Sequence, residues 1–321
     1  MPLANFPNGF RGGVQIQGMP QIGVYSTSAG VLNPRTAGVW FVDSATGLDG
    51  NKGDSWYQPL ATIQGAFTKA AAYDIILVKA GHAETISTAT AAAWNVAGVQ
   101  IVGLGIGSAV PQITLDTLTT STITVSAANI SVTNCQFVAN FANIATLFTL
   151  TTAKGFTMNS CVVRDTSSIL NFLIVVTTSA TSNANDGLLL TNNNVFLAAT
   201  SGVVNFVKFV GTHDRCQISG NYFSSATTNA AAVFPISTTK VLTNFQLLSN
   251  DFNLVNAIGT GTGYLITTDG STNSGIIAGN YDHSLPSTPL LCTASSGFIY
   301  NGNLHSDVAD LQGYLVPAAD V

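Results

Sequence analysis

Four side chains near the end of the sequence have the types and spacing of a metal site. Asp282 and His283 are adjacent, and His305 and Asp307 follow one unit of a sequence repeat later. Imidazole nitrogens and carboxylate oxygens are common ligands of divalent metals. The two histidines occupy the same offset in consecutive copies of the repeat, so we expect them to be neighbours. Because solvated corner residues explain the same pattern, we expect no bound metal or other cofactor.

A polysaccharide-cleaving site would need carboxylates that meet in space, about 5 to 10 Å apart in glycosidases. Counted forward from the first apolar residue of each copy, the acids fall at four offsets, +7, +4, +5 and +8 for Asp165, Asp251, Asp282 and Asp307. This predicts that no carboxylate pair stacks in register. All three tryptophans precede the repeat, which removes the usual large aromatic platforms for sugar rings. We therefore expect a protein that is not an enzyme.

The repeat itself consists of a short segment that recurs from Asn129 onward. Its copies begin with an apolar residue, at positions 132, 158, 190, 218, 247, 277 and 299. A second apolar strand lies between successive copies, with loops of variable length and no helical pattern. Parallel strands that coil and stack about 4.8 Å apart tolerate such loops. The pattern predicts a parallel β-helix with two strands per unit.

Small or asparagine residues follow the first apolar residue of each copy. Asparagine and glycine adopt the left-handed backbone conformation of a sharp corner at the lowest cost. Asparagine side chains at stacked corners can also hydrogen-bond from turn to turn. We expect such a structural ladder to contain Asn134, Asn192, Asn193, Asn221, Asn250, Asn280 and Asn301.

The four cysteines are expected to be buried thiols. Cys135 and Cys161 share one offset in adjacent copies, which places their Cα atoms about 4.8 Å apart, within disulfide range. The first eleven residues show no secretory signal pattern, which favours stacked thiols over a disulfide. Cys216 and Cys292 fall in strand patterns and are expected in the core.

The segment before the repeat carries a family resemblance. It contains a predicted strand at 39–42, a Gly/Asp/Asn-rich loop, a predicted amphipathic helix at 60–72 beginning near Pro59, and a strand at 75–78 that ends in Lys79-Ala-Gly81. The loop residues 49–54 lack the spacing of a calcium loop and are expected to form a plain turn. This succession resembles the opening of pectate-lyase-like right-handed parallel β-helix proteins, in which the helix closes the N-terminal end of the coil. The resemblance implies an all-β, single-stranded right-handed parallel β-helix over residues 39–305.

The two ends of the chain are expected to have separate roles. Residues 1–38 are rich in proline and glycine, cannot build a core, and are predicted to be an extended arm that anchors the protein to a partner surface. The anchoring residues are expected to be Phe6, Phe10, Arg11, Val14, Ile16 and Ile22. Residues 306–321 are predicted to form a C-terminal cap, with a short helix that is N-capped by Ser306.

Charge is scarce throughout the sequence. Only 8% of the residues are charged and the formal net charge is −5, against about 25% charged residues in ordinary soluble domains. Ten scattered basic residues exclude a nucleic-acid footprint, and glycines divide the longest charge-free stretch into strand-sized pieces, which excludes a membrane helix. Outward strand faces built of Thr, Ser, Asn and apolar side chains suit packing of coils side by side in a homotrimer.

Arm, coil and low charge together resemble the trimeric decoration, or cement, proteins of tailed-bacteriophage capsids. That resemblance implies a non-enzymatic virion protein that is made in the host cytoplasm, binds the major capsid protein at the capsid surface and stabilises the shell. Adhesion to a host surface glycan is compatible with it. The alternative is a phage tail-spike or fibre domain that binds or cleaves host polysaccharide. A non-viral cell-surface β-helix is the third interpretation.

Overall fold

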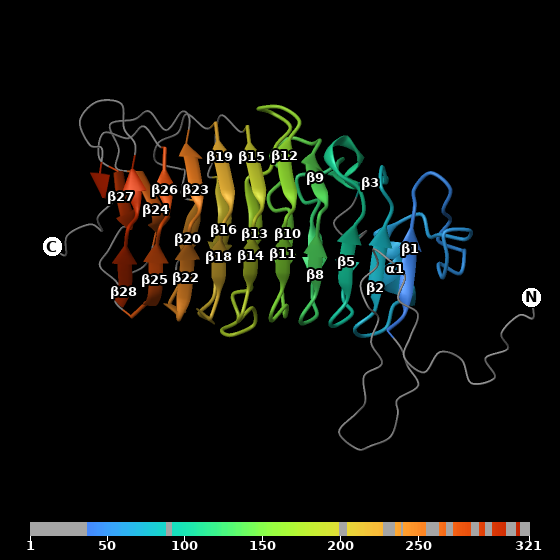
Figure 1. Ribbon diagram of the computed structural model, residues 1–321, viewed down its shortest axis with the longest axis horizontal. Helices are drawn as coiled ribbons and strands as arrows, with labels where there is room; N and C mark the ends of the chain where they lie inside the picture. The colour runs from blue at the N-terminus through green and yellow to red at the C-terminus, as the bar shows by residue number, and fades with distance from the viewer. Residues whose placement is uncertain are drawn as a thin grey trace, which may run out of the picture.

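The structure, a computed structural model, describes residues 37–87, 92–198, 204–226, 235–238, 240–254, 263–267, 272–283, 289–292, 297–305 and 313–314. These residues coil into an elongated right-handed parallel β-helix (Figure 1). This is the architecture that the pectate-lyase-like resemblance implies. None of the described helices is long and apolar enough to cross a membrane.

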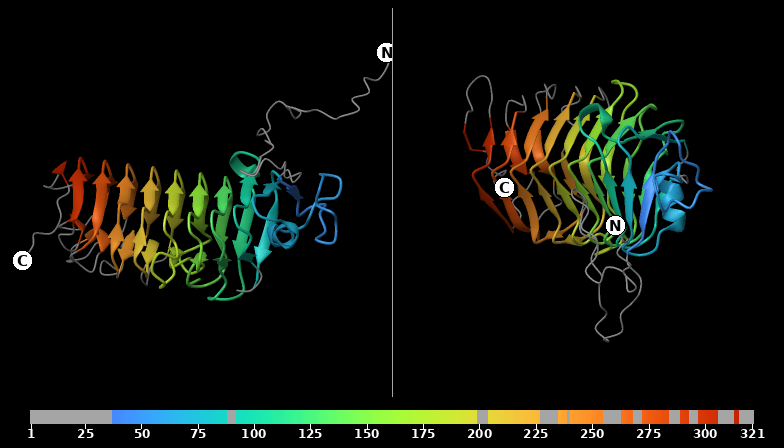
Figure 2. Two further views of the ribbon diagram at one scale, coloured as in Figure 1. Left: turned by 90° about the horizontal axis from the view of Figure 1, so that it is seen from below. Right: turned by 45° about the vertical axis from the view of Figure 1, so that its right-hand side comes forward.

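Each full turn of the coil contributes one strand to each of three sheets, here named A, B and C, and Figure 2 shows the stacked turns from two further sides. The prediction of two strands per unit is therefore wrong. The recurring segment is not one strand but two, because a single residue in the left-handed conformation divides it. Asn134, with φ 55°, separates a strand of sheet A from the following strand of sheet B.

Sheet A has ten parallel strands. In spatial order they are β1 (Val39–Val42), β2 (Ile75–Val78), β5 (Gln100–Gly103), β8 (Ser131–Thr133), β11 (Thr157–Asn159), β14 (Leu189–Thr191), β18 (Gln217–Ser219), β22 (Phe245–Leu248), β25 (Ser274–Ala278) and β28 (Gly297–Asn301).

Sheet B also has ten strands, and its last strand is antiparallel to its neighbour. In order they are β3 (Ala83–Ile86), β6 (Gln112–Leu115), β9 (Gln136–Ala139), β12 (Val162–Asp165), β15 (Asn194–Leu197), β19 (Tyr222–Ser225), β23 (Asp251–Leu254), β26 (Tyr281–Asp282), β29 (Leu304–His305) and β30 (Gly313–Tyr314). The predicted C-terminal helix is wrong at this point, because Gly313 and Tyr314 pair as a strand with His305 and Leu304. The rest of the expected cap lies outside the described residues.

Sheet C has eight strands. They are β4 (Ala93–Trp94), β7 (Ile123–Val125), β10 (Phe148–Leu150), β13 (Ile174–Thr177), β16 (Asn205–Phe209), β20 (Ile236–Thr238), β24 (Gly263–Thr267) and β27 (Pro289–Cys292). The short strands β17 (His213–Asp214) and β21 (Leu242–Thr243) pair at the corner between sheets C and A, and η1 (Gly107–Ala109) is one turn of 3-10 helix.

The interior of the coil is filled by alternate residues of every strand, as the period of a β-strand requires. Aromatic rings contact one another inside the coil: the Phe148 ring lies 5.0 to 5.4 Å from the rings of Trp94, Phe137 and Phe156, in tilted or edge-to-face contacts. All four side chains are buried. The core is therefore continuous from turn to turn.

Helix α1 (Ile63–Lys69) covers the N-terminal end of this core, in agreement with the expected capping helix. Ile63, Ala66 and Phe67 are buried, and the Phe67 ring stacks on Trp94 at 5.8 Å. The helix is shorter than predicted because it begins after Thr62, whose side chain caps the N–H of Gly65. Before it, the Leu60 N–H pairs with the Phe41 carbonyl.

The corner between sheets A and B has the same geometry in seven consecutive turns. The corner residues have φ values from 52° to 65°, and they are Asn134, Ser160, Asn192, Gly220, Ser249, Gly279 and Gly302. In the last copy Ile277 pairs with Tyr300 and not with Ile299. The predicted alignment of that copy is therefore wrong by one residue.

Candidate functional surfaces

Five asparagines form a hydrogen-bonded ladder inside the coil, directly after the corner between sheets A and B. In each step the Nδ2 of one asparagine donates to the Oδ1 of the next, one turn along, at 2.8 to 2.9 Å. The backbone N–H of the same residue donates to that Oδ1 as well, and Nδ2 also donates to a backbone carbonyl. The inner ladder consists of Asn193, Asn221, Asn250, Asn280 and Asn303.

The other asparagines expected in a ladder lie outside it. Asn134 is a corner residue, and its Nδ2 donates to the carbonyls of Gly103 and Gly105. Asn192 is also a corner residue, and Asn301 is exposed. Asn303 takes the place expected for Asn301 because the predicted alignment of the last copy is shifted by one residue. Every member of the inner ladder is at most 2% exposed, so the inner ladder stabilises the coil and offers nothing to a ligand.

The two histidines proposed as neighbours are not in register. His305 pairs with Asp282, which is buried, whereas His283 is one position further along on the outer face of sheet B. His283 lies beside Asp251, with Nε2 3.3 Å from Oδ1. Asp307 lies outside the described residues. Within the described part of the chain, no group of three potential ligands comes together to hold a metal ion.

One pair of carboxylates does occupy matching positions of adjacent turns, contrary to the expectation from the sequence. Asp186 and Asp214 lie at the same place in the corner between sheets C and A, three residues before the paired Leu189 and Gln217, and Asp186 Oδ1 accepts the N–H of Asp214 at 2.9 Å. Thr243 and Asn244 both donate to Asp214 Oδ1 at 2.8 Å. These hydrogen bonds lower the pKa of Asp214 below its usual value, Asn244 first and Thr243 second. Offsets counted forward from the first apolar residue of each copy do not reveal the pair, because both residues lie four positions before it.

The acidic loop near the N-terminus is structural, as expected for a plain turn. Asp49 accepts the N–H groups of Ala61 and Thr62 at 2.9 Å, ahead of helix α1. Asp43 is bonded by Lys79 Nζ at 2.5 Å and by the Thr46 hydroxyl. Burial alone would raise the pKa of Asp43, but the hydrogen bonds from Lys79 and Thr46 hold it below its usual value.

Three cysteines are free and buried, which agrees with the expected thiols: Cys135, Cys161 and Cys216. Cys135 and Cys161 directly follow their corner residues, as the ladder asparagines do in later turns. Asn193 Oδ1 accepts the N–H of Cys161, so the inner ladder continues the column of these two cysteines. Burial raises the pKa of Cys161 and of Cys216 to about 12. Thiols that stay protonated are poor nucleophiles. The side chain of Cys292 is outside the described set.

The outer face of sheet A carries no charge. Its ten described strands contain no Asp, Glu, Lys, Arg or His residue. One outward row, here called the sheet A row, is in register over eight strands, and none of its residues is buried. Its members are Gln100, Ser131, Thr157, Leu189, Gln217, Gln246, Ile276 and Ile299.

The outer face of sheet B differs, because it carries aromatic rings beside polar groups. Phe196 is 45% exposed, and its ring lies 5.4 Å from that of Tyr222 on the next strand. Farther along, the Tyr281 ring lies 4.2 Å from His283 in an edge-to-face contact. The repeats hold no tryptophan, as the sequence shows, but their outward positions +4 and +6 hold tyrosine and phenylalanine, respectively. Aromatic rings therefore do lie on the outer face of the coil.

The residues expected to anchor the arm, Phe6, Phe10, Arg11, Val14, Ile16 and Ile22, lie outside the described residues.

Comparison with known proteins identifies no family. No family model matches the sequence, and no curated protein matches it. Among solved structures, the chain is similar to a rhamnogalacturonan lyase, at 11% identity and a TM-score of 0.38 over 86% of this chain and 89% of that one. It is also similar to a GH136 lacto-N-biosidase from Eubacterium ramulus, at 10% identity and a TM-score of 0.34 over 88% and 68% of the two chains. Similarities this weak support no argument about activity.

Proposed function

We propose that the protein is a non-enzymatic structural protein that assembles into homotrimers and decorates the capsid of a tailed bacteriophage. In this role it is made in the host cytoplasm, binds the major capsid protein through its N-terminal arm and stabilises the shell at the virion surface. The observation that carries the proposal is the charge-free outer face of sheet A. The assignment to a phage capsid comes from the resemblance of the arm, the coil and the composition to capsid decoration proteins.

A charge-free sheet face favours association because its burial against a partner desolvates no charged group. Moving an unpaired charge out of water is costly, whereas Thr, Ser and Gln exchange hydrogen bonds with water for hydrogen bonds with a partner. The C-terminal end of the sheet A row is apolar, with Ile276 42% and Ile299 65% exposed on adjacent strands. Covering such neighbouring apolar side chains gains about 25 cal/mol per Å². Three coils that pack their A faces together would achieve this.

The role of the arm is tested with capsids. Full-length protein and a chain lacking residues 1–38 are mixed with undecorated capsids, and bound protein is measured after sedimentation. The proposal expects binding by the full chain and at least a tenfold loss without the arm. Equal binding by the two chains would contradict arm-mediated attachment.

The second candidate is a tail-spike or fibre domain that cleaves host polysaccharide, and the stacked pair of Asp186 and Asp214 favours it. Their spacing of one turn, about 4.8 Å between backbones, is close to the separation of carboxyl groups in retaining glycosidases. However, a glycosidase acid needs a raised pKa, and the pKa of Asp214 is lowered. Release of reducing ends from host polysaccharide by the wild type, and its loss in D186N and D214N, would favour this candidate over the structural role.

A further inference from the structure

A row of ring and polar side chains crosses four adjacent strands on the outer face of sheet B, from β15 to β26. Inward neighbours of these residues, such as Val195, Phe223 and Phe252, are fully buried, so the row itself points outward. Strand spacing gives it a length of about 14 Å. The sheet B row consists of Phe196, Tyr222, Asp251, Asn253, Tyr281 and His283.

The rings in this row are held in place by polar neighbours. Asn253 Nδ2 donates to the Tyr222 hydroxyl at 3.1 Å, across adjacent strands. Asp251 pairs in register with Tyr222 on one side and with Tyr281 on the other. His283 contacts both Asp251, at 3.3 Å, and the Tyr281 ring. Tyr222 and Tyr281 therefore each have a polar neighbour, and Phe196 packs against the Tyr222 ring. All members of the row except His283, which directly follows β26, lie in strands of the sheet.

Such a surface is unusual for the solvent-facing side of a coil. Nearer the N-terminal end, the same face presents Gln112 and Gln136, which bond to each other at 2.8 Å. Exposed aromatic rings cost solubility, and rigid tyrosines beside asparagine and serine are the typical composition of recognition surfaces. The sheet B row therefore has the composition of a binding surface.

We infer that the sheet B row binds a linear, neutral oligosaccharide that lies along the axis of the coil. A sugar ring has an apolar C–H face that packs on an aromatic ring, and its rim of hydroxyl groups both donates and accepts hydrogen bonds. The amide of Asn253, the carboxylate of Asp251 and the imidazole of His283 supply matching partners. Asp251 and the exposed Arg164, which pairs with Phe196, bring opposite charges to the same face, which favours a neutral ligand over an acidic one.

This inference goes beyond the proposed structural function and does not depend on it. The sheet A row and the sheet B row lie on different sheets, so a trimer that buries the A faces leaves the B faces outward. A decoration protein with such a row would also attach to glycans, and no bond of the glycan would be cleaved.

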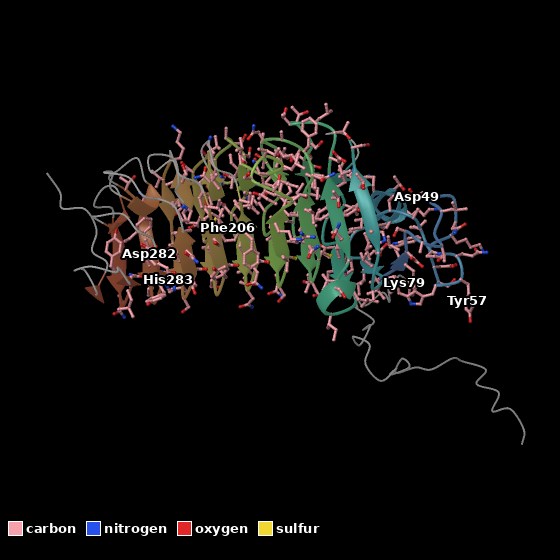
Figure 3. All side chains as sticks on the ribbon, turned by 90° about the horizontal axis from the view of Figure 1, so that it is seen from above. Asp49, Tyr57, Lys79, Phe206, Asp282 and His283 are labelled. Atoms are coloured by element: carbon pink, nitrogen blue, oxygen red, sulfur yellow. The ribbon has the colours of Figure 1, made fainter. Side chains whose placement is uncertain are left out.

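The test uses the full-length protein and three neutral hexasaccharides, maltohexaose, cellohexaose and xylohexaose, with hexagalacturonate as the acidic probe, in isothermal titration calorimetry. We expect at least one neutral probe to bind, and F196A and Y281A each to weaken that binding about tenfold or more. The matched control is Y57A, because Tyr57 is 97% exposed and lies at the opposite, N-terminal end of the molecule from His283 (Figure 3).

Unchanged thermal unfolding of F196A and Y281A shows that the variants fold, since both side chains point away from the core. A subtler variant, Y222F, keeps the ring and removes only the hydroxyl, so it should weaken binding less than F196A does. The inference is overturned if no neutral hexasaccharide binds, if only hexagalacturonate binds, or if Y57A lowers the affinity as much as F196A. None of these results bears on the trimer.

Discussion

Asn221 donates a hydrogen bond from Nδ2 to Oδ1 of Asn250, one turn along the coil, at 2.9 Å. The Asn221 N–H donates to the same oxygen at 3.0 Å, and Asn221 Oδ1 in turn accepts the corresponding pair of donors from Asn193. Each amide is thus fully engaged in a dry interior. Fully satisfied polar networks of this kind stabilise one register, and partly satisfied ones are costly.

Removing one member of the inner ladder should therefore destabilise the coil strongly. N221A removes the oxygen that accepts from both the N–H and the Nδ2 of Asn193, and it removes one of the two donors to Asn250 Oδ1. Each buried group left unsatisfied costs about 1 to 3 kcal/mol. We expect the free energy of unfolding to fall by about 3 kcal/mol in urea titrations. The control is N192G, because the exposed corner residue Asn192 has φ 56°, which glycine also adopts. Similar losses in both variants would show that the ladder contributes little.

Buried thiols should make the protein sensitive to alkali. The pKa of Cys161 and Cys216 is raised from 9.0 to about 12, so the unfolded chain releases these protons first. The stability is fully present below pH 9 and falls between pH 9 and 12, by about 1.4 kcal/mol per pH unit for each thiol. Urea titrations at pH 8, 9 and 10 should show a shallower decline in C216A than in the wild type. Parallel slopes would refute this account.

The protein should lose stability at low pH as Asp43, in the loop before helix α1, becomes protonated. The pKa of Asp43 in the folded protein lies below the unfolded value of 3.8, so its contribution is present above pH 4 and is lost as the pH falls through the folded value. K79M removes the principal partner of a carboxylate that is only 3% exposed. We expect K79M to lower the free energy of unfolding by about 1 to 2 kcal/mol at pH 7, and by less at pH 3.

The matched control for that experiment is K154M. The Lys154 side chain is 58% exposed, and its Nζ lies 3.8 Å from Asp186 Oδ2. Surface ion pairs of this kind contribute about 0 to 1 kcal/mol to the free energy of unfolding. If K154M and K79M lower the stability equally at pH 7, the Asp43 pair has no special role.

Much of the coil can be predicted from the sequence because the residues that repeat along it strongly prefer either burial or a left-handed backbone conformation. Apolar residues recur at the inward positions, and Asn134 and Gly220 mark corners that demand a left-handed backbone. The finer geometry is ambiguous for physical reasons. Asn192 and Asn193 are adjacent and chemically identical, and only the fold places one outside and the other in the ladder.

The candidate surfaces are harder to predict because they depend on register across turns. Ile299 and Tyr300 are both acceptable as the apolar start of the last copy, and the wrong choice shifts the register of His305 by one residue, from Asp282 to His283. The sheet B row is divided among four repeat units that are separated by loops of different length. The shared offset of +4 for Tyr222 and Tyr281 can be read from the sequence, but only the register across turns shows that Asp251 lies between them.

The charge-free face gives a sharp prediction for assembly. Gln217 and Gln246 are neighbours on the outer face of sheet A, and the isosteric double variant Q217E/Q246E places two unpaired carboxylates there. Burying them against a second copy would cost several kcal/mol. The control is Q112E/Q136E, a neighbouring pair on the outer face of sheet B. The two pairs are matched, because Gln217 donates to the Ser219 hydroxyl and Gln112 donates to the Thr114 hydroxyl, each at 3.1 Å.

The measurement that tests the structural role most directly is the solution mass of the full-length protein by light scattering, for the wild type and these two double variants. The account predicts a mass near three times 33.2 kDa for the wild type and for Q112E/Q136E, and a mass near 33.2 kDa for Q217E/Q246E. A wild-type monomer, or a trimer that Q217E/Q246E leaves intact, would contradict association through sheet A.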